Sequence, residues 1–516
     1  MVGRFDFASR RGANAGMIRP LRQALAVLAL LLAVPARAAE RAPDLVLTGT
    51  LTGADHQTYR EVPFQVPPGM GRLTVTFDYT GKDDRSVIDL GLRDPQRLRG
   101  WSGGNKSRVT LEESWATPSY LPGPLLPGTW KLVLGAPNIR RTGHAAYTAR
   151  IWYEPMTAPF AGFVVGPVKP GPGWYRGDLH MHTAHSDGSC LSHRGAKVPC
   201  PVFKTLEAAA ARGLDFIAVS DHNGVAQDEA LGELAPYFDD LLLIPAREIT
   251  TFHGHANVFG PTGPIDFQLG GPRAATFTHL LDQVEAAHGL ISINHPGLPS
   301  GEACMGCGWS VEGVNYGRVP AVEVVNGGTL GFPGAPEGPL SGIPFWEAQL
   351  NAGRRMTGVG GSDNHEATLA PDRPSAVGLP TTVVHAPELS QPAILEAIRQ
   401  GHVFVDVWGT KDRLLEVEAR AGAGRAEMGD VIEVAANRPV EVSVHVAGVP
   451  AASVLSLAGD AAPAVRLANP ALPGAEFRQT FTFVADGGSH WLRIDVRDSS
   501  GRLILIGNPI YLRPPR

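Results

Sequence analysis

The stretch Tyr175–Cys190, YRGDLHMHTAHSDGSC, places two histidines two residues apart at the end of a strand-like pattern. A strand points residues i and i+2 to the same face, so His180 and His182 would lie side by side. Two adjacent imidazoles can bind one metal ion, and Asp187, in the Gly/Ser-rich turn that follows, could reach the same site or a neighbouring one. A single His-x-His pair is weak evidence of a metal site, so further ligands must come from elsewhere in the chain.

Apolar stretches alternate with helical patterns on the C-terminal side of this segment. Apolar strands are predicted at 214–220, 241–246, 255–259, 290–294, 321–325, 356–360 and 377–384. Helices are predicted at 202–212, 276–288, 345–352 and 392–400. Strands that alternate with helices are typical of a parallel sheet, and this many units predict a closed or distorted β/α barrel.

Most of these apolar strands end in a residue that can bind a metal ion. LDFIAVS is followed by Asp221 and His222, and LLLIPAR is followed by Glu248 and then by HGHANVFG. LISIN precedes His295, and TGVGGS precedes Asp363 and a histidine two residues later. In β/α barrels the C-terminal ends of the strands converge at one mouth, where the catalytic groups gather. Together with the opening stretch, these strand ends predict a metal centre.

The ligand types indicate which ions would bind. Imidazoles and carboxylates without a thiolate suit zinc, manganese or iron. The nine candidates are too many for one tetrahedral ion, so two or three divalent ions are expected: His180, His182, Asp187, His222, Glu248, His255, His295, Asp363 and His365. Closely spaced ions lower the pKa of bound water and hold the attacking and leaving oxygens, which predicts hydrolysis by a metal-bridging hydroxide.

Three other regions flank this central segment, which we expect to span 174–408. Apolar and polar residues alternate over 39–155 between Pro-Gly turns, which predicts a β-sandwich. A Pro/Gly-rich linker is expected over 156–173, and alternation returns over 413–516 as a second, smaller sandwich.

The N-terminus has the features of an export signal over residues 1–38. Arg19 and Arg22 precede the apolar run from Ala24 to Val34, and Ala36-Arg37-Ala38 has the small residues of a cleavage site. We therefore expect an exported protein, periplasmic or secreted, with no stable membrane insertion after cleavage; an uncleaved membrane anchor is the alternative.

The cysteine content and the charge agree with export and argue against a nucleic-acid partner. The four cysteines, Cys190, Cys200, Cys304 and Cys307, allow three disulfide connectivities, of which the two sequence-local pairs are the simplest. A zinc ion bound by four thiolates is the rival interpretation. Without residues 1–38, which carry six Arg and one Asp, 39 basic and 49 acidic residues remain. This acidic balance lacks the basic face that nucleic-acid binding requires.

The phrases DLHMHTAHSDG, VSDHN, REITTFHGHANVFG, INHPG and GGSDNH resemble the ordered motifs of the PHP (polymerase and histidinol phosphatase) metallohydrolases. This resemblance covers about residues 175–405 and implies a distorted (β/α)7 barrel between the two sandwiches. The CLSHRGAKVPC segment, the flanking regions, the export signal and the ending GNPIYL are similar to the carbaryl-hydrolase-like CehA/McbA branch.

The resemblance implies three ion sites. His180 and His182 would hold one ion, with Glu248 and Asp363 as bridging ligands. Glu248 would also belong to the second site, together with His255 and His295. The third site would consist of Asp187, His222 and His365. The chain has Asp rather than His at 187, so the resemblance leaves the filling of the third site open. Catalysis is assigned to His180, His182, Glu248, Asp363 and His365.

The expected substrate is a small-molecule ester, with a phosphoester as the default class. The alternatives are a carbamate or aryl ester cleaved at the same metal centre, and a polymer- or glycan-binding protein with a relic barrel. Asn223 and His253 are candidates for substrate binding. The predicted mouth loops carry the aromatic residues Trp309, Tyr316, Phe332 and Trp346, which favour an apolar substrate. Arg318, Arg354 and Arg355 are candidate phosphate ligands by residue type alone.

Two acidic residues could support the metal ligands. Asp178 shares the predicted strand face of His180 and could orient its ring or serve a structural role. Glu323, in VEVVNG, could face the barrel interior and touch the metal ligands, or it could be structural.

Overall fold

The fold is described from a computed structural model, which covers residues 41–159, 162–164, 166–302, 304, 306–460, 474 and 476–515. Residues 44–516 form one compact unit. The expected export signal lies outside the described residues. Within the described residues, no helix combines the length and apolar character needed to cross a bilayer.

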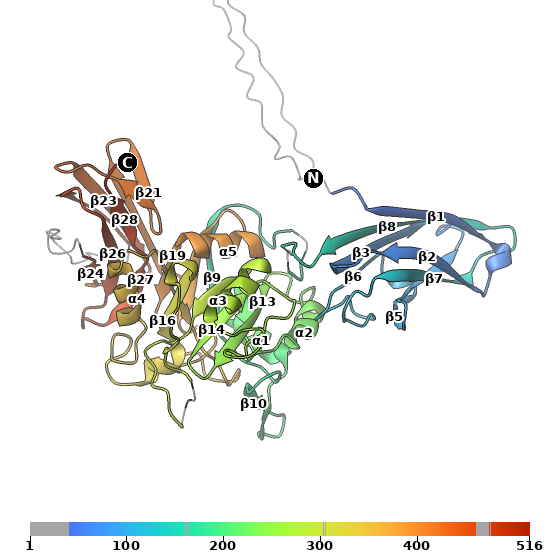
Figure 1. Cartoon of the computed structure of the whole chain (residues 1–516), viewed down its shortest axis with the longest axis horizontal. Coiled ribbons are helices and arrows are strands. Elements are labelled where there is room, and N and C mark those ends of the chain that lie inside the picture. Colours follow the sequence, from blue (N-terminus) through green and yellow to red (C-terminus); the bar gives the residue numbers. More distant parts are fainter. Residues whose placement is uncertain are drawn as a thin grey trace, which may run out of the picture. The chain divides into compact units, whose positions relative to one another are not determined.

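The N-terminal part of this unit contains two antiparallel sheets of four strands (Figure 1). One has the order β1 (Leu45–Thr52), β8 (His144–Pro155), β3 (Met70–Tyr79), β6 (Arg108–Leu111). The other has the order β2 (Tyr59–Val66), β7 (Gly128–Asn138), β4 (Val87–Arg93), β5 (Leu98–Trp101). Leu73 and Val75 of the first sheet share one buried core with Leu90 and Leu132 of the second. Two 3-10 turns, η1 (Gly53–Asp55) and η2 (Gly103–Asn105), lie in the connecting loops.

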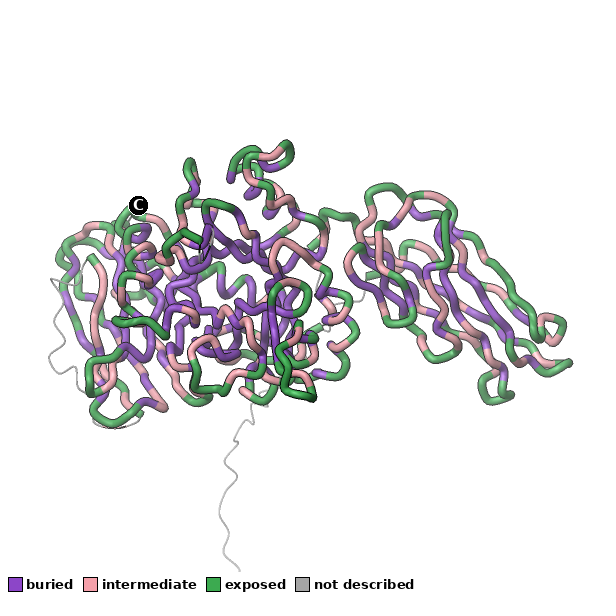
Figure 2. The backbone as a smooth tube through the Cα atoms, turned by 90° about the horizontal axis from the view of Figure 1, so that it is seen from below, coloured by how far each residue is buried: buried purple, intermediate pink, exposed green. Residues whose placement is uncertain are grey.

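The central strands belong to a large mixed sheet. Their order is β17 (Thr357–Gly361), β16 (Ala321–Asn326), β15 (Leu290–Ile293), β14 (Gly254–Phe259), β13 (Leu242–Thr251), β12 (Phe216–Val219), β9 (Gly173–Asp178), β18 (Thr381–Ala386), β19 (Val403–Asp406). Every residue of β12, β14, β15, β16, β17 and β19 is buried, which explains why these strands are mostly apolar and lack the alternation of half-exposed strands. Figure 2 shows the buried backbone gathered in the interior of the molecule.

The prediction of a parallel sheet is wrong at β14 and at β18. β9, β12 and β13 pair in parallel, as do β15, β16 and β17. β14 pairs antiparallel with both β13 and β15, and β18 pairs antiparallel with both β9 and β19. For β14 the antiparallel pairing has a local cause: only Phe252 and His253 separate β13 from β14, and a two-residue loop can join only antiparallel strands.

The two ends of the central strand set are linked through a side chain. The Thr382 hydroxyl of β18 donates to the Gly360 carbonyl of β17 at 2.7 Å and accepts from the Gly360 amide at 2.8 Å. β17 and β18 have no backbone pairing with each other in the described sheet order. Closure into a seven-unit barrel therefore stays a prediction.

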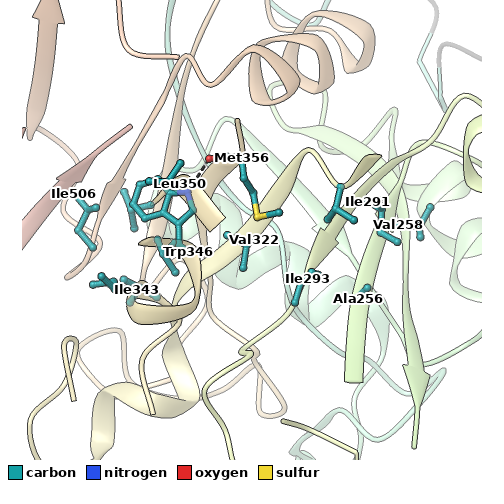
Figure 3. Packing of buried hydrophobic residues seen from close by; sticks show 14 of the residues in the cluster. Ala256, Val258, Ile291, Ile293, Val322, Ile343, Trp346, Leu350, Met356 and Ile506 are labelled. Carbon is teal, nitrogen blue, oxygen red and sulfur yellow. Dashed lines mark hydrogen bonds between the residues drawn. The ribbon is translucent and has the colours of Figure 1, made fainter. Parts of the chain in front are cut away.

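Helices and short turns lie between the central strands. They are α1 (Val202–Arg212), α2 (Gln227–Leu234), α3 (Phe277–Ala286), η3 (Tyr316–Arg318), η4 (Gly327–Gly331), α4 (Ile343–Asn351) and α5 (Gln391–Gln400). Trp346 of α4 is fully buried against the sheet, and its indole donates to the Met356 carbonyl at 2.7 Å (Figure 3). The expectation that Trp346 lines the mouth is therefore wrong, because its ring is part of the buried hydrophobic core.

The C-terminal segment extends the central sheet. β27 (Leu503–Gly507) pairs with β19 and leads on to β26 (His490–Arg497), β28 (Ile510–Arg513) and β22 (Val431–Glu433), with β24 (Val454–Ala458) on β26. A separate sheet has the order β21 (Gly424–Glu427), β20 (Leu414–Ala421), β23 (Pro439–Ala447), β25 (Phe477–Val484). Asn508 bonds to the backbone of Gly358 and Val403, so the ending GNPIYL braces two central strands. The expected domain boundaries stay predictions.

Candidate metal centre

The nine predicted metal ligands all come from one end of the central strands. His180 and His182 follow β9, and His222 follows β12. Glu248 lies in β13, and His255 lies at the start of β14. The others are in the loops after their strands: Asp187 after β9, His295 after β15, and Asp363 and His365 after β17.

These nine side chains form four groups that could each hold a metal ion. The groups are His182, Asp187, His222 and His365; His180, His182 and Glu248; His180, His295 and Asp363; and Glu248, His255 and His295. Within each group the ligand atoms lie within 4.8 Å of one another. His180, His182, Glu248 and His295 belong to two groups each, so the geometry suits several neighbouring ions that share ligands.

The grouping matches two of the expected ligand sets and divides the other. Glu248, His255 and His295 form one group as expected, and Asp187, His222 and His365 lie together. His182 joins this latter group as well as pairing with His180. The first expected set is divided, because Asp363 groups with His180 and His295.

Glu248 is the hub of the centre. Its Oε1 lies 3.3 Å from His180 Nε2, 3.3 Å from His255 Nδ1 and 3.4 Å from His295 Nε2. Its Oε2 lies 2.8 Å from His222 Nδ1, and its side chain is 1% exposed. Burial by itself raises the pKa of Glu248, but the neighbouring histidines outweigh burial and hold the pKa well below its usual range. Glu248 is thus a buried carboxylate placed to bridge ions.

Asp363 is the second shared carboxylate. Its Oδ1 lies 3.3 Å from the Nε2 atoms of both His180 and His182. Asp363 and His295 both have positive φ angles, 51° and 28°, in the region that non-glycine residues rarely adopt. Such backbone strain is characteristic of functional sites, where the surrounding structure holds a side chain in place.

Three buried nitrogen atoms test whether metal ions fit these residues. Nε2 of His180, of His182 and of His255 makes no hydrogen bond within the described chain, although each atom is buried. A buried polar atom without a partner is costly and calls for an unseen water or ion. All three atoms belong to residues of the four groups. The residues therefore fit divalent ions, which would bind these nitrogen atoms and the adjacent carboxylates.

The other ring nitrogen of several histidines is held by a neighbour. His180 Nδ1 lies 3.1 Å from Glu323 Oε1, His295 Nδ1 donates to the Cys307 carbonyl at 3.2 Å, and His365 Nδ1 donates to the Asp363 carbonyl at 2.9 Å. A proton on Nδ1 leaves the Nε2 lone pair directed into the centre.

Glu323, and not Asp178, is the residue that orients the His180 ring. Glu323 Oε2 also accepts from the His295 amide at 2.9 Å and from Asn326 at 2.9 Å. Asp178 has the structural role: its carboxylate accepts from the amides of His180, Ser362 and Gly378. A lone acidic residue inside the apolar run of β16 is the sequence signal that marks Glu323.

One end of the centre is open to solvent. The side chains of Asp187, His365 and His222 are 57%, 42% and 27% exposed. Asp187 Oδ1 lies 3.6 Å from His222 Nε2 and 3.4 Å from His365 Nε2, and these contacts hold the pKa of Asp187 far below its usual range. Burial lowers the pKa of His222, but Asp187 and Glu248 outweigh burial and raise it to about 10.

The two predicted substrate-binding residues lie close in sequence to metal-ligand candidates, Asn223 next to His222 and His253 two residues before His255. The Asn223 amide group is engaged, because Oδ1 accepts from the Thr250 amide at 2.8 Å and Nδ2 donates to the Thr250 carbonyl at 3.2 Å. His253 is exposed at the tip of the β13–β14 hairpin, next to Phe252, which is 87% exposed. Their roles in substrate binding stay predictions.

Both expected disulfides are present in the structure. Cys190 pairs with Cys200 and Cys304 pairs with Cys307, with Cα–Cα distances of 4.9 and 5.6 Å. The loop of the second pair carries the carbonyl that accepts from His295, and the first pair lies in a hairpin that follows Asp187. A zinc site made of the four thiolates is thus ruled out in this structure, since each cysteine is bonded to its sequence neighbour.

No family model and no curated protein matches the chain. Among solved structures, a candidate metal-dependent phosphoesterase from Bifidobacterium adolescentis is similar at 13% identity with a TM-score of 0.28. The similarity covers 43% of this chain and 95% of that chain. A TM-score this low does not establish a shared fold.

Proposed function

We propose that this protein is a metal-dependent hydrolase of ester bonds and that phosphoesters are its substrates. The observation that carries the proposal is the convergence of nine imidazole and carboxylate side chains into overlapping groups, in which three buried nitrogen atoms make no hydrogen bond. We further propose that export precedes function, as the N-terminal sequence indicates, and that the substrate is a small molecule.

Zinc, manganese or iron ions bound at these groups would lower the pKa of water and neutralise the negative charge that develops on the substrate oxygens. His180 would bind through its buried Nε2 atom and His255 would bind beside Glu248, with Glu248 and Asp363 as shared carboxylates. The exposed side chains of Asp187, His222 and His365 mark the side from which a substrate can approach. The buried side, around Glu248, would exclude solvent.

A carbamate or aryl ester is the second candidate substrate class, and two observations favour it. The exposed ring of Phe252 lies at the tip of the hairpin that carries His255, where an aryl group could pack against it. The three arginines considered as phosphate ligands are engaged elsewhere. Arg318 pairs with Asp282 and Glu285, Arg354 lies over the Tyr316 ring, and Arg355 donates to the Gly429 carbonyl.

A binding protein with a relic barrel is a weaker alternative. A relic centre could lose ligands without consequence, whereas all nine predicted ligands here lie within one of the four groups. We therefore favour catalysis.

Turnover of a substrate panel tests the proposal. The purified protein, supplied with Zn²⁺, Mn²⁺ or Fe²⁺, is assayed on aryl phosphates, phosphodiesters, nucleotides, aryl carbamates and aryl esters. We expect turnover of a phosphoester that His182→Ala and Asp363→Ala abolish. Turnover of carbamates alone would favour the second class, and the absence of turnover on every substrate with metal bound would contradict the enzyme proposal.

A further inference from the structure

The hairpin that follows the opening metal-binding stretch forms no part of a larger sheet. β10 (Ser189–Leu191) and β11 (Lys197–Pro199) make a two-stranded sheet of their own, paired over three residues on each strand. Isolated two-stranded hairpins are marginally stable in water. The buried cluster beneath this hairpin contains only Cys190, Cys200 and Ala367, with Val198 packed against it. The Cys190–Cys200 disulfide is thus the main element that holds the two strands together.

One strand of the hairpin holds the turn that presents Asp187. The Cys200 carbonyl accepts from the Ala184 amide at 2.7 Å, and the Cys200 amide donates to the Gly188 carbonyl at 3.0 Å. These two bonds lie on either side of Asp187. The backbone of one cysteine therefore fixes both ends of the short turn from which this exposed carboxylate reaches His222 and His365.

The other strand holds the backbone of a second exposed ligand. Ser189, next to Cys190, donates to the His365 carbonyl twice, from its amide at 2.8 Å and from its hydroxyl at 2.9 Å. The Ser189 carbonyl accepts from the Ala367 amide at 3.2 Å. Each strand of the disulfide-linked hairpin therefore positions one ligand of the open group.

We propose that the Cys190–Cys200 disulfide is a positioning element for the open metal group and that its formation sets the affinity of that group for a divalent ion. The inference rests on the proposed function only in requiring that this group binds metal. The hairpin is one of several restraints on these two exposed ligands. The turn of Asp187 is also held by the Ser186 and Gly188 amides, which donate to the Thr183 carbonyl at 3.1 and 2.9 Å, and the His365 ring is held by the Asp363 carbonyl at 2.9 Å. The buried group around Glu248 has no contact with the hairpin among the described hydrogen bonds, so its affinity should not depend on this disulfide.

The proposal makes filling of the open group dependent on thiol oxidation. In the reaction the two thiols of Cys190 and Cys200 form one S–S bond, and an oxidising disulfide such as oxidised glutathione accepts the two electrons and two protons and becomes two thiols. Reduction of the pair reverses this exchange and releases the two strands.

Zinc affinity and stoichiometry test the proposal without reference to turnover. The full chain and its Cys190→Ala/Cys200→Ala variant are titrated with Zn²⁺ in competition with a chromophoric chelator, after circular dichroism has verified folding. We expect the variant to bind its weakest Zn²⁺ equivalent at least about tenfold less tightly, as for other losses of ligand support, and its other equivalents unchanged. The Asp187→Asn variant should lose the same equivalent.

The second disulfide supplies the matched control. Cys304→Ala/Cys307→Ala removes a bridge of the loop that contacts His295, so it should leave the weakest equivalent unchanged. In this background Cys190 and Cys200 are the only cysteines of the chain, so reduction followed by reoxidation with oxidised glutathione switches one bridge alone. This arm applies even if the Cys190→Ala/Cys200→Ala variant fails to fold.

The outcomes separate the two proposals. Affinity for the weakest Zn²⁺ equivalent that falls on reduction and is restored on reoxidation supports the inference. Unchanged affinity in the reduced protein overturns it. A chain that binds Zn²⁺ as expected but hydrolyses no ester contradicts the proposed function and leaves this inference supported.

Discussion

The buried and open ends of the candidate metal centre are built from the same residue types but are held in different ways. At the buried end Glu248 is 1% exposed and lies between His180, His255 and His295, whose rings come from or directly follow strands of the central sheet. At the open end Asp187 and His365 come from loops. The difference indicates that the sheet pre-organises the buried end, whereas the open end depends on loop contacts and a hairpin.

The two ends should therefore differ in affinity and in role. A buried, pre-organised group loses little conformational freedom when it binds an ion. An exposed group must order its side chains and remains accessible to competing water. We expect tight, slowly exchanging ions at the buried end and a weaker, exchangeable ion at the open end, where the substrate would enter.

The largest effect is expected from Glu248→Gln. This change removes the charge that five histidines surround, including His182, whose Nε2 lies 3.7 Å from Glu248 Oε2, so the buried end should lose its ions. We expect turnover to fall by about three orders of magnitude, which corresponds to about 4 kcal/mol of transition-state stabilisation. Metal analysis and kcat/KM on the best substrate measure the two effects. Full metal content in this variant would show that Glu248 is not the hub.

A smaller and selective effect is expected from Asp187→Asn. The change removes one exposed ligand and leaves the contacts of Glu248 with His180, His255 and His295 intact. We expect the loss of one metal equivalent and a fall in turnover of about tenfold to a hundredfold. Elemental analysis after gel filtration counts the ions. If Asp187→Asn lost every ion, the two ends would not be independent.

These predictions depend on ligands that could be identified from the sequence, because the signal is local. Each ligand lies in or close behind an apolar strand, and the strand ends of such a sheet meet at one edge. The supporting residues were harder to predict. Asp178 contacts an amide 200 residues away, at Gly378, and Glu323 contacts His180 from 143 residues away. The isolated acidic residue in β16 marks Glu323 as a candidate, but the partner of each of these carboxylates depends on the register of distant strands, which no local pattern specifies.

The fold shows the same division between local and distant information. Apolar runs predicted most central strands, but the β13–β14 hairpin was missed because its two-residue loop, Phe252 and His253, lacks the usual glycine or asparagine of a tight turn. The pairing of β27 with β19 could not be predicted, since it joins segments about a hundred residues apart.

Glu323→Gln should have an intermediate effect, confined to the buried end. The glutamine keeps the shape of the side chain but loses the charge that orients the His180 ring through Nδ1. We expect metal affinity at the buried end to fall by about tenfold to a hundredfold, with the open end unaffected. Chelator competition resolves the two classes of ion. An unchanged affinity at both ends would assign Glu323 a structural role only.

The smallest effect on the centre is expected at Asp228, a buried carboxylate without histidine neighbours. Burial raises the pKa of Asp228 to about 8, although attraction to Arg247 and a hydrogen bond from Ser114 at 2.9 Å partly offset it. The carboxylate of Glu248, equally buried, has its pKa lowered by the histidines around it. The contrast shows that a buried carboxylate stays charged only when neighbouring cationic groups offset the effect of burial on its pKa.

Asp228→Asn should therefore leave metal content unchanged and alter only the pH dependence of stability. Asp228 stays protonated in the folded protein up to about pH 8, whereas an unfolded Asp ionises near pH 4. The wild-type protein thus loses stability as the pH rises from about 4 to about 8, by at most about 1.4 kcal/mol per pH unit from this group. The variant should lack this loss, which thermal unfolding over pH 4–8 measures. Parallel pH profiles of the two proteins would contradict the raised pKa.

The central claim is that one multinuclear centre has two ends that differ in their access to solvent. The release of bound zinc to excess chelator tests this claim most directly. Zinc-loaded wild-type protein should release one equivalent in a fast phase and the remainder in a slow phase, and Asp187→Asn should lack the fast phase alone. A single phase that Asp187→Asn leaves unchanged, or a protein that retains no zinc, would contradict the account.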